Sequence, residues 1–239
     1  MSKHPGIYSD IGKKARDCLY KDYTQQPPIH FHYQFLDWSL NLSCQFNEFV
    51  PGFRTGFKFF MPCQRSNKVE LEYLHDYFGV AAGISLSTKP LLNFSGAIGS
   101  SLFSIGTDLS LDVAATPFAK FNAGLSFNSA ILIAALTLNN TFDTLKLSCY
   151  RSINSLTDTA VAAELAHGFW TNETILTFGI QHALFPITKV KARVDTSGKI
   201  GALIQQRLLP PLHLTIAGEV DVKAIATSAK VGLSLSLRP

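Results

Sequence analysis

Charged side chains occupy every second position in one short segment, ITKVKARVD, which covers residues 187–195. One parity holds Lys189, Lys191, Arg193 and Asp195, and the other holds Val190, Ala192 and Val194. A row of ammonium and guanidinium groups attracts anions, so this row is suited to anion recognition. A helix would scatter these charges around its circumference, whereas a strand places alternate side chains on opposite faces. The segment is therefore predicted to be a strand with one charged and one apolar face.

No motif of an enzymatic reaction accompanies this row. The sequence has no GxSxG, no P-loop, no HExxH and no GxGxxG following a strand. His167 and His182 lie near Glu164 and Glu173, but we interpret them as isolated polar residues near turns rather than metal ligands. The cysteines stand alone without a CxxC pair, at Cys18, Cys44, Cys63 and Cys149. We therefore expect a protein that is not an enzyme and that needs neither a metal nor a cofactor.

The composition favours a protein whose outer surface contacts something other than water. Hydrophobic residues make up 46% of the 239 residues, and charged residues only 16%, against roughly 25% in soluble domains. The net charge of +4 indicates a mild preference for anionic partners. The longest purely apolar run, ILIAAL from Ile131, is far shorter than the roughly 18 to 20 residues of a transmembrane helix. Membrane strands give a weaker signal, and they remain compatible with this sequence.

Residues 1–26 are predicted to form an N-terminal amphipathic helical segment. Ile7, Ile11, Ala15 and Leu19 recur at helical spacing, with basic residues between them. Ser9 or Asp10 could cap the helix, and the prolines at positions 27 and 28 end it. Two interpretations stay open: a surface helix packed on a core, or a basic helix lying against a membrane or inside a cavity.

Residues 27–239 are predicted to form an all-β structure of about sixteen strands, because apolar and polar residues alternate throughout. Spacings of about 12 to 14 residues and turn sequences between the segments favour antiparallel hairpins. The predicted strands cover residues 29–35, 38–46, 53–60, 68–74, 77–87, 91–100, 102–112, 118–127, 131–139, 144–151, 159–168, 173–182, 187–195, 200–208, 212–221 and 230–237.

Alternation fits two architectures: a soluble sandwich or barrel with its apolar face inside, and a membrane barrel with its apolar face in lipid. A closed barrel of this size is too wide for its side chains to fill. Aromatic residues gather near segment ends, as in Phe169 with Trp170, and the polar face is rich in Ser, Asn and Thr. These features favour a transmembrane antiparallel β-barrel. Its register should be tightly fixed, because each Lys or Arg turned into lipid costs about 2–4 kcal/mol at the bilayer midplane.

Several stretches resemble the voltage-dependent anion channels, the porins of the mitochondrial outer membrane, and especially the plant members. They are HPGIYSDIGKKARDCLYKDY, LEYLHDYFG, NFSGAIG, IGTDLSLD, FNAGLSF, QHALFPITKVKARVDTSGKIGALIQ and GEVDVKAIATSAKVGLSLSLRP. The resemblance implies a voltage-gated, weakly anion-selective porin of the mitochondrial outer membrane with the N-terminal helix in its pore. Small hydrophilic metabolites such as ATP, ADP, phosphate and organic anions would diffuse through it.

Anion selectivity in such a pore would come from basic residues on the polar face. The candidates are Lys13, Lys14, Arg16, Arg54, Lys58, Lys120, Lys146, Lys189, Lys191, Arg193, Arg207 and Lys230. Acidic residues share the polar face, so the preference should be modest. Lys230, Gly232, Leu235 and Leu237 fit the polar-x-Gly-x-x-apolar-x-apolar pattern of a mitochondrial sorting signal. Expected partners are membrane lipid, ions and small anionic metabolites, and no nucleic acid; a homo-oligomer and kinase-type partners at the cytosolic face stay open.

The chain also departs from the family it resembles. After Tyr23 it runs through TQQPPIHFHYQF straight into LDWSLNLSCQFNE, where about three strands of the family's nineteen have no counterpart. An even strand number would let the first and last strands pair antiparallel. Phe185 stands where the family usually has Asp near the C-terminal signature. Three alternatives stay open: a shortened family member that does not conduct, a protein-import barrel, and a soluble lipid-binding β-barrel.

Overall fold

The computed structural model describes residues 5–21, 23, 40–47, 53–61, 68–85, 90–112, 116–154, 156–185, 187–209, 212–224 and 230–237. These residues form fifteen strands, one short α-helix and two 3-10 turns. The chain divides into two compact units, which are described separately. The first contains Met1–Ile11, Tyr33–Asn128 and Ala135–Leu145, and the second contains Gly12–His32, Ser129–Ala134 and Lys146–Pro239.

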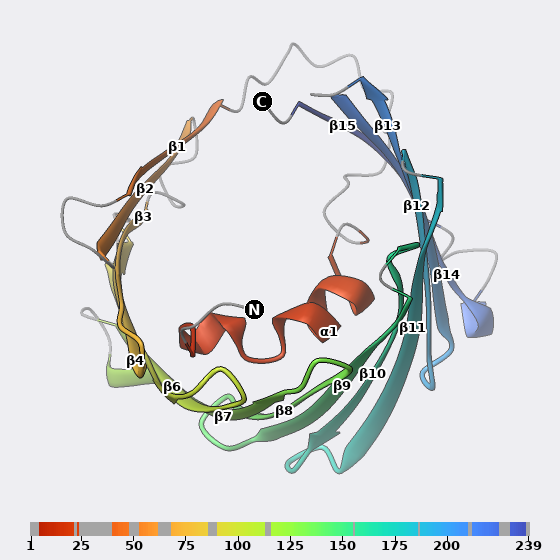
Figure 1. Cartoon of the computed structure of the whole chain (residues 1–239). Helices are drawn as coiled ribbons and strands as arrows, with labels where there is room; N and C mark the ends of the chain where they lie inside the picture. Colours follow the sequence, from red (N-terminus) through yellow and green to blue (C-terminus); the bar gives the residue numbers. More distant parts are fainter. Residues whose placement is uncertain are drawn as a thin grey trace. The chain divides into compact units, whose positions relative to one another are not determined.

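The first unit is an antiparallel sheet whose strands are hydrogen-bonded in chain order from β1 to β7 (Figure 1). A 3-10 turn, η1 (Tyr8–Asp10), precedes these strands in the chain. The strands are β1 (Leu40–Asn47), β2 (Phe53–Met61), β3 (Lys68–Leu74), β4 (Phe78–Ser85), β5 (Leu91–Gly99), β6 (Phe103–Asp112) and β7 (Thr116–Asn128). Strand β8 (Leu132–Asn139) begins in the second unit and ends in the first.

The second unit repeats this arrangement with α1 (Lys13–Leu19) and strands that again follow chain order (Figure 1). Strand β9 (Thr144–Asn154) begins in the first unit and continues in the second. The other strands of the second unit are β10 (Thr159–Gly168), β11 (Glu173–Phe185), β12 (Thr188–Asp195), β13 (Lys199–Leu209), β14 (Leu212–Asp221) and β15 (Lys230–Leu237). A 3-10 turn, η3 (Val222–Ala224), follows β14. Successive strands are joined without helical crossovers among the described residues, so the predicted hairpin topology is confirmed.

Every predicted strand that falls on described residues is present, and the predicted strand at 29–35 lies outside them. The strand at the opening charged row is β12, which pairs Val190 with His182 and Ile204, and Lys191 with Gln181 and Leu203. Alternation therefore predicted the faces of β12 correctly.

The apolar face of each unit is exposed and the polar face is partly covered, the reverse of a soluble sheet. In the second unit Phe178, Ile180 and Ile204 are 47–48% exposed, whereas Thr177 and Lys191 on the opposite parity are 5% exposed. In the first unit Ile98 and Ile105 are more than half exposed, while Ser104 is buried. A soluble protein rarely exposes so continuous an apolar surface. The apolar faces are therefore suited to contact lipid.

Gly12 divides the N-terminal segment into η1 and α1. Its φ of +67° lies in the left-handed region, which glycine adopts without steric cost. The prediction that Ser9 or Asp10 caps the main helix is wrong: α1 begins only at Lys13, and Asp10 Oδ2 instead accepts a hydrogen bond of 3.2 Å from the Ile7 amide. No helix among the described residues is long and apolar enough to cross a membrane.

Candidate functional site

The apolar stripe of α1 packs on the polar face of β10, β11 and β12 in the second unit. Ala15, Cys18 and Leu19 are almost fully buried and form a cluster with Ala162 of β10. Gly179 of β11 allows the close approach, because a Cβ there would lie 2.6 Å from Leu19 Cδ2. Small residues on an otherwise polar face therefore create the surface that receives the helix, and the predicted stripe is confirmed.

Two cations of β12 bind the C-terminal end of α1. Lys191 Nζ donates a hydrogen bond of 2.9 Å to the carbonyl oxygen of Asp17, and Arg193 Nη1 donates one of 3.2 Å to that of Leu19. The last carbonyls of a helix have no partner within the helix and carry the negative end of its dipole. Lys191 and Arg193 are two residues apart in β12, so both side chains lie on the same face of the strand and each can bind one of these carbonyls.

Arg193 also contacts three further groups. Its Nη2 atom lies 2.6 Å from Glu219 Oε2 of β14, and its guanidinium carbon lies 5.4 Å from the ring centre of Tyr20 and 4.7 Å from that of Tyr23. Both distances allow cation–π attraction. We name Arg193, Glu219, Tyr20 and Tyr23, with the carbonyl of Leu19, the Arg193 clamp. It joins the residues that follow α1 to two strands.

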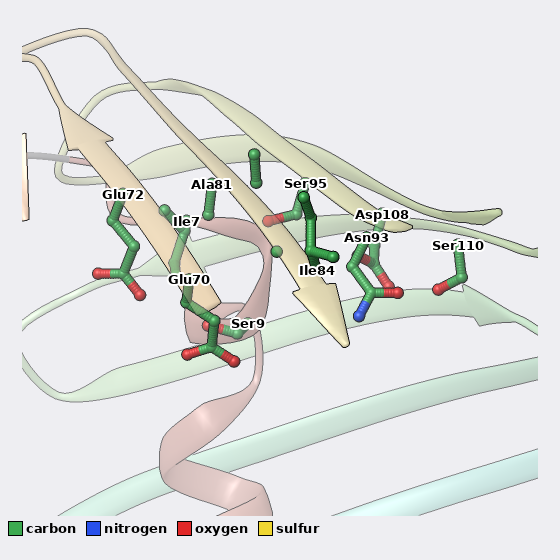
Figure 2. Close-up of a pocket in the computed structure, with 12 residues that line it drawn as sticks. Ile7, Ser9, Glu70, Glu72, Ala81, Ile84, Asn93, Ser95, Asp108 and Ser110 are labelled. Carbon is green, nitrogen blue, oxygen red and sulfur yellow. The ribbon is translucent and has the colours of Figure 1, made fainter. Parts of the chain in front are cut away.

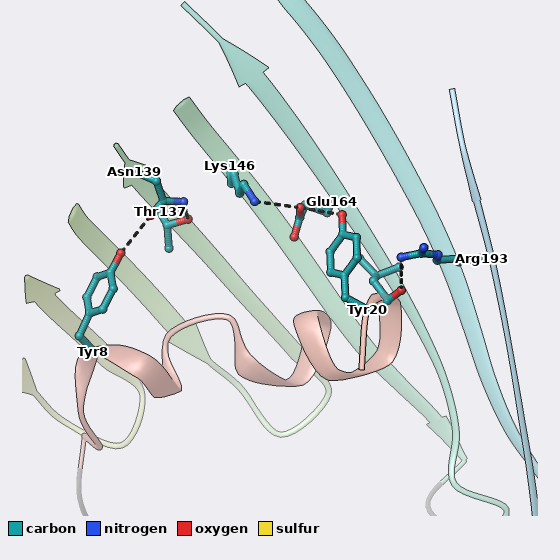
Figure 3. Close-up of polar contacts among 8 residues, drawn as sticks. Tyr8, Tyr20, Thr137, Asn139, Lys146, Glu164 and Arg193 are labelled. Carbon is teal, nitrogen blue, oxygen red and sulfur yellow. Dashed lines mark hydrogen bonds and ion pairs between the residues drawn. The ribbon is translucent and has the colours of Figure 1, made fainter. Parts of the chain in front are cut away.

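Tyr20 extends this network to β10, as Figure 3 shows. Its hydroxyl donates a hydrogen bond of 2.9 Å to Glu164 Oε1, and Lys146 Nζ lies 3.8 Å from the same oxygen. Burial is the main cause that raises the pKa of Tyr20 to about 12, so the phenol stays protonated and can donate at physiological pH. Burial likewise raises the pKa of the Cys18 thiol, which makes this cysteine less reactive while α1 is docked.

In the first unit, the residues before Gly12 also lie on a polar face. Tyr8 OH donates a hydrogen bond of 3.2 Å to Asn139 Oδ1 (Figure 3), and Ile11 is 2% exposed. A Cβ on Gly124 would lie 3.2 Å from Ile11 Cγ2. Glycine on β7 thus provides space for the N-terminal segment, as glycine does on β11 of the second unit.

An acidic groove of about 400 Å³ lies beside η1 in the first unit (Figure 2). Glu70 and Glu72 of β3 and Asp108 of β6 contribute carboxylates, together with neutral polar groups such as Asn93 and Ser95. Asp108 Oδ2 accepts a hydrogen bond of 3.2 Å from Asn122 Nδ2. The polar faces therefore carry acidic as well as basic groups.

The predicted basic residues fall into three groups. Lys146 and Lys189 form ion pairs with Glu164 and Asp158, while Lys191 and Arg193 hold α1. The exposed cations are Lys13, Lys14, Arg16, Lys120, Arg207 and Lys230. Arg54 and Lys58 lie in β2, and their side chains are outside the described residues, as are those of Leu235 and Leu237.

The roles of Tyr20, Tyr23 and Gly179 were not predicted from the sequence. The two tyrosines and Arg193 are about 170 positions apart, and only the fold brings them together. Tyr20 and Tyr23 are spaced by three residues, which places them on one side of a helical turn, and this was the one available signal.

The chain matches the family described as eukaryotic porin over residues 33–232. It belongs to this family. The chain is 44% identical over 276 aligned positions to the mitochondrial outer membrane protein porin of 36 kDa of Solanum tuberosum, with both chains covered fully. It is 40% identical to the mitochondrial outer membrane protein porin 1 of Arabidopsis thaliana and 41% identical to an outer plastidial membrane protein porin of Pisum sativum, again with full coverage.

The solved structures similar to this eukaryotic porin include mutants of the porin of Rhodopseudomonas blastica. One has a TM-score of 0.61 at 10% identity, with 82% of this chain and 88% of that chain covered. At this identity the likeness shows the fold alone, which is the porin β-barrel. The prediction of a transmembrane antiparallel β-barrel is therefore confirmed.

The alignment with the potato porin also measures how far this eukaryotic porin is shortened. It spans 276 positions, while the chain has 239 residues, so at least 37 positions have no counterpart here. At the spacing of about 12 to 14 residues for a strand plus its turn, this equals about three strands. The family membership shows a pore-forming channel of the outer membrane, in contact with lipid and passed by small solutes. Its relatives place it in the mitochondrion, and the predicted localisation is confirmed.

Proposed function

We propose that this porin is a voltage-gated, weakly anion-selective pore through which ATP, ADP, phosphate and small organic anions diffuse. The observation that carries the proposal is the docking of a basic helix on the polar face. The buried side of α1 contacts β10–β12, and its opposite side carries Lys13, Lys14 and Arg16, all exposed. In this proposal the polar faces line the water-filled pore and α1 lies within it.

Weak selectivity follows from the mixed charge of the polar faces. The exposed cations attract anions, whereas the carboxylates of the acidic groove oppose them. The net charge of +4 leaves a small excess of cations. Such a balance admits multiply charged metabolites without binding them so tightly that they cannot leave.

Voltage gating is proposed to act on the charge of α1. The helix contains three cations and Asp17, which gives a net charge of +2. One elementary charge that crosses 100 mV changes free energy by about 2.3 kcal/mol, so two charges that cross half of this drop supply about 2 kcal/mol. This is similar to the strength of one charge-assisted hydrogen bond. Voltages of this size can therefore compete with the contacts that dock the helix.

Single-channel recording in planar bilayers tests the function. We expect open channels at low voltage, closure at higher voltage of either sign, and a reversal potential in a KCl gradient that indicates mild anion preference. A folded, membrane-inserted protein that never conducts would instead support the non-conducting alternative.

Charge reversal on the exposed helix and on β13 should shift the selectivity. We expect the double variant Lys14→Glu with Arg207→Glu to move the reversal potential toward that of a cation-selective pore, because it removes two cations and adds two anions. Arg207→Lys, which keeps the charge, should leave the potential unchanged. These positions are preferable to Lys191 and Arg193, since reversal there would also undock α1. An unchanged reversal potential in the double variant would remove both residues from the pore.

A further inference from the structure

One charged residue occupies the apolar face of the strands. Among the fifteen described strands, Arg151 of β9 is the one Lys, Arg, Asp or Glu on the parity that carries the exposed apolar side chains. Its neighbour Tyr150 packs against the cluster that holds α1, which assigns Tyr150 to the polar face. Because side chains alternate along a strand, Arg151 lies on the opposite, lipid-facing side.

A groove surrounds this arginine. It has a volume of about 710 Å³, and apolar and small side chains from three neighbouring segments line it. They include Ile131, Cys149, Ile153, Val161 and Ala163. All of them belong to the second unit. The groove is thus mostly apolar, and Arg151 contributes the one guanidinium group that lines it.

Nothing in the described part of the chain forms an ion pair with Arg151. A charge on the lipid-facing side destabilises a membrane strand, least near the interface. Arg151 is three residues from Asn154, the last residue of β9, which is about 10 Å along the strand. Because membrane strands are tilted, this length corresponds to a depth of about 7 Å below the end of the strand. A long arginine side chain that extends toward the interface can reach the lipid headgroups from that depth.

We propose that this groove binds an anionic phospholipid of the surrounding membrane. The guanidinium of Arg151 donates paired hydrogen bonds to the phosphate, and an acyl chain lies along Val161, Ala163 and Ile153. Charge complementarity selects the occupant: a zwitterionic lipid carries a cation that offsets its phosphate, whereas an anionic lipid neutralises the arginine. The apolar walls favour a membrane lipid over a free phosphate compound.

Native mass spectrometry of the refolded full-length protein in detergent tests the proposal. Phosphatidylglycerol, phosphatidylcholine and free glycerol phosphate are titrated separately, and Kd for the first bound molecule is measured. We expect Arg151→Gln to weaken phosphatidylglycerol binding about tenfold, the effect of losing a charged hydrogen-bond partner. Phosphatidylcholine binding should change little. Arg207→Gln removes an equal charge from the polar face and should retain wild-type lipid binding.

Two further variants separate lipid binding from misfolding. Arg151→Lys keeps the charge without the paired geometry and should give an intermediate Kd. Ala163→Phe fills the groove and should weaken phosphatidylglycerol binding although Arg151 is present. Circular dichroism confirms that each variant is folded. Equal phosphatidylglycerol affinity in the wild type, Arg151→Gln and Ala163→Phe would overturn the proposal, and so would glycerol phosphate binding as tightly as the lipid.

Discussion

Replacement of Arg193 by glutamine is expected to undock α1 and to expose Cys18. The change removes the contacts that join Arg193 to the helical segment, which are the hydrogen bond to the Leu19 carbonyl and two ring contacts. Charged hydrogen bonds contribute about 1.5–3 kcal/mol and cation–π contacts about 0.5–1 kcal/mol each. A total loss of about 3 kcal/mol raises the undocked population about a hundredfold.

The rate of maleimide labelling at Cys18 measures this population. Cys18 is 1% exposed while α1 is docked, and burial also raises the pKa of its thiol, so labelling requires undocking. The other cysteines, Cys44, Cys63 and Cys149, are first replaced by serine. In this background we expect Arg193→Gln to accelerate labelling by about tenfold to a hundredfold.

The channel formed by the Arg193→Gln variant should also close at a lower voltage than the wild-type channel, because less electrical work is needed to move the helix.

Arg207→Gln is the matched control for this experiment. It removes the same charge from a neighbouring strand but lies outside the Arg193 clamp. We expect its Cys18 labelling rate to equal that of the parent protein. If both variants labelled at the same rate, the clamp would not be what holds the helix.

A lysine at position 204 is expected to destabilise the protein strongly, and a lysine at position 205 is not. Ile204 is the central residue of β13, is 47% exposed, and pairs with Val190 and Ile216 on the apolar face. In lipid, Ile204→Lys should cost about 2–4 kcal/mol. In water, lysine at a half-exposed position would change stability by less than about 0.5 kcal/mol.

Unfolding by urea in lipid vesicles provides the measurement. Gln205→Lys is the control, since Gln205 lies on the polar face of the same strand. It should leave the free energy of unfolding nearly unchanged and make the pore slightly more anion-selective. Equal effects of the two substitutions would contradict the assignment of the faces.

The strands and their faces could be predicted because they depend on local alternation. In β12 the pattern of Lys189, Lys191 and Arg193 was sufficient to assign both faces. Which face meets lipid does not follow from alternation, because a soluble barrel has the same period. The exposure of Phe178 and Ile180 beside buried Lys191 provided that information.

The candidate site was less predictable, because its contacts join distant parts of the sequence. The stripe of Ile11, Ala15 and Leu19 predicted a packed helix but not its partners. Gly12 was not recognised as the break between η1 and α1, since a glycine within an amphipathic stripe is compatible with a continuous helix. The roles of Lys191 and Arg193 in holding α1 required the three-dimensional fold.

The central claim is that the apolar face of the strands contacts lipid and the polar face contacts water. The most direct test is to measure which of the two surrounds each of several consecutive positions of β13. Spin labels are placed singly on cysteines that replace residues 202–206, and collision rates with oxygen and with a water-soluble nickel complex are measured in vesicles. The structure predicts high oxygen collision at 202, 204 and 206, and high nickel collision at 205. A nickel-accessible label at 204 together with an oxygen-accessible label at 205 would show that the faces are reversed.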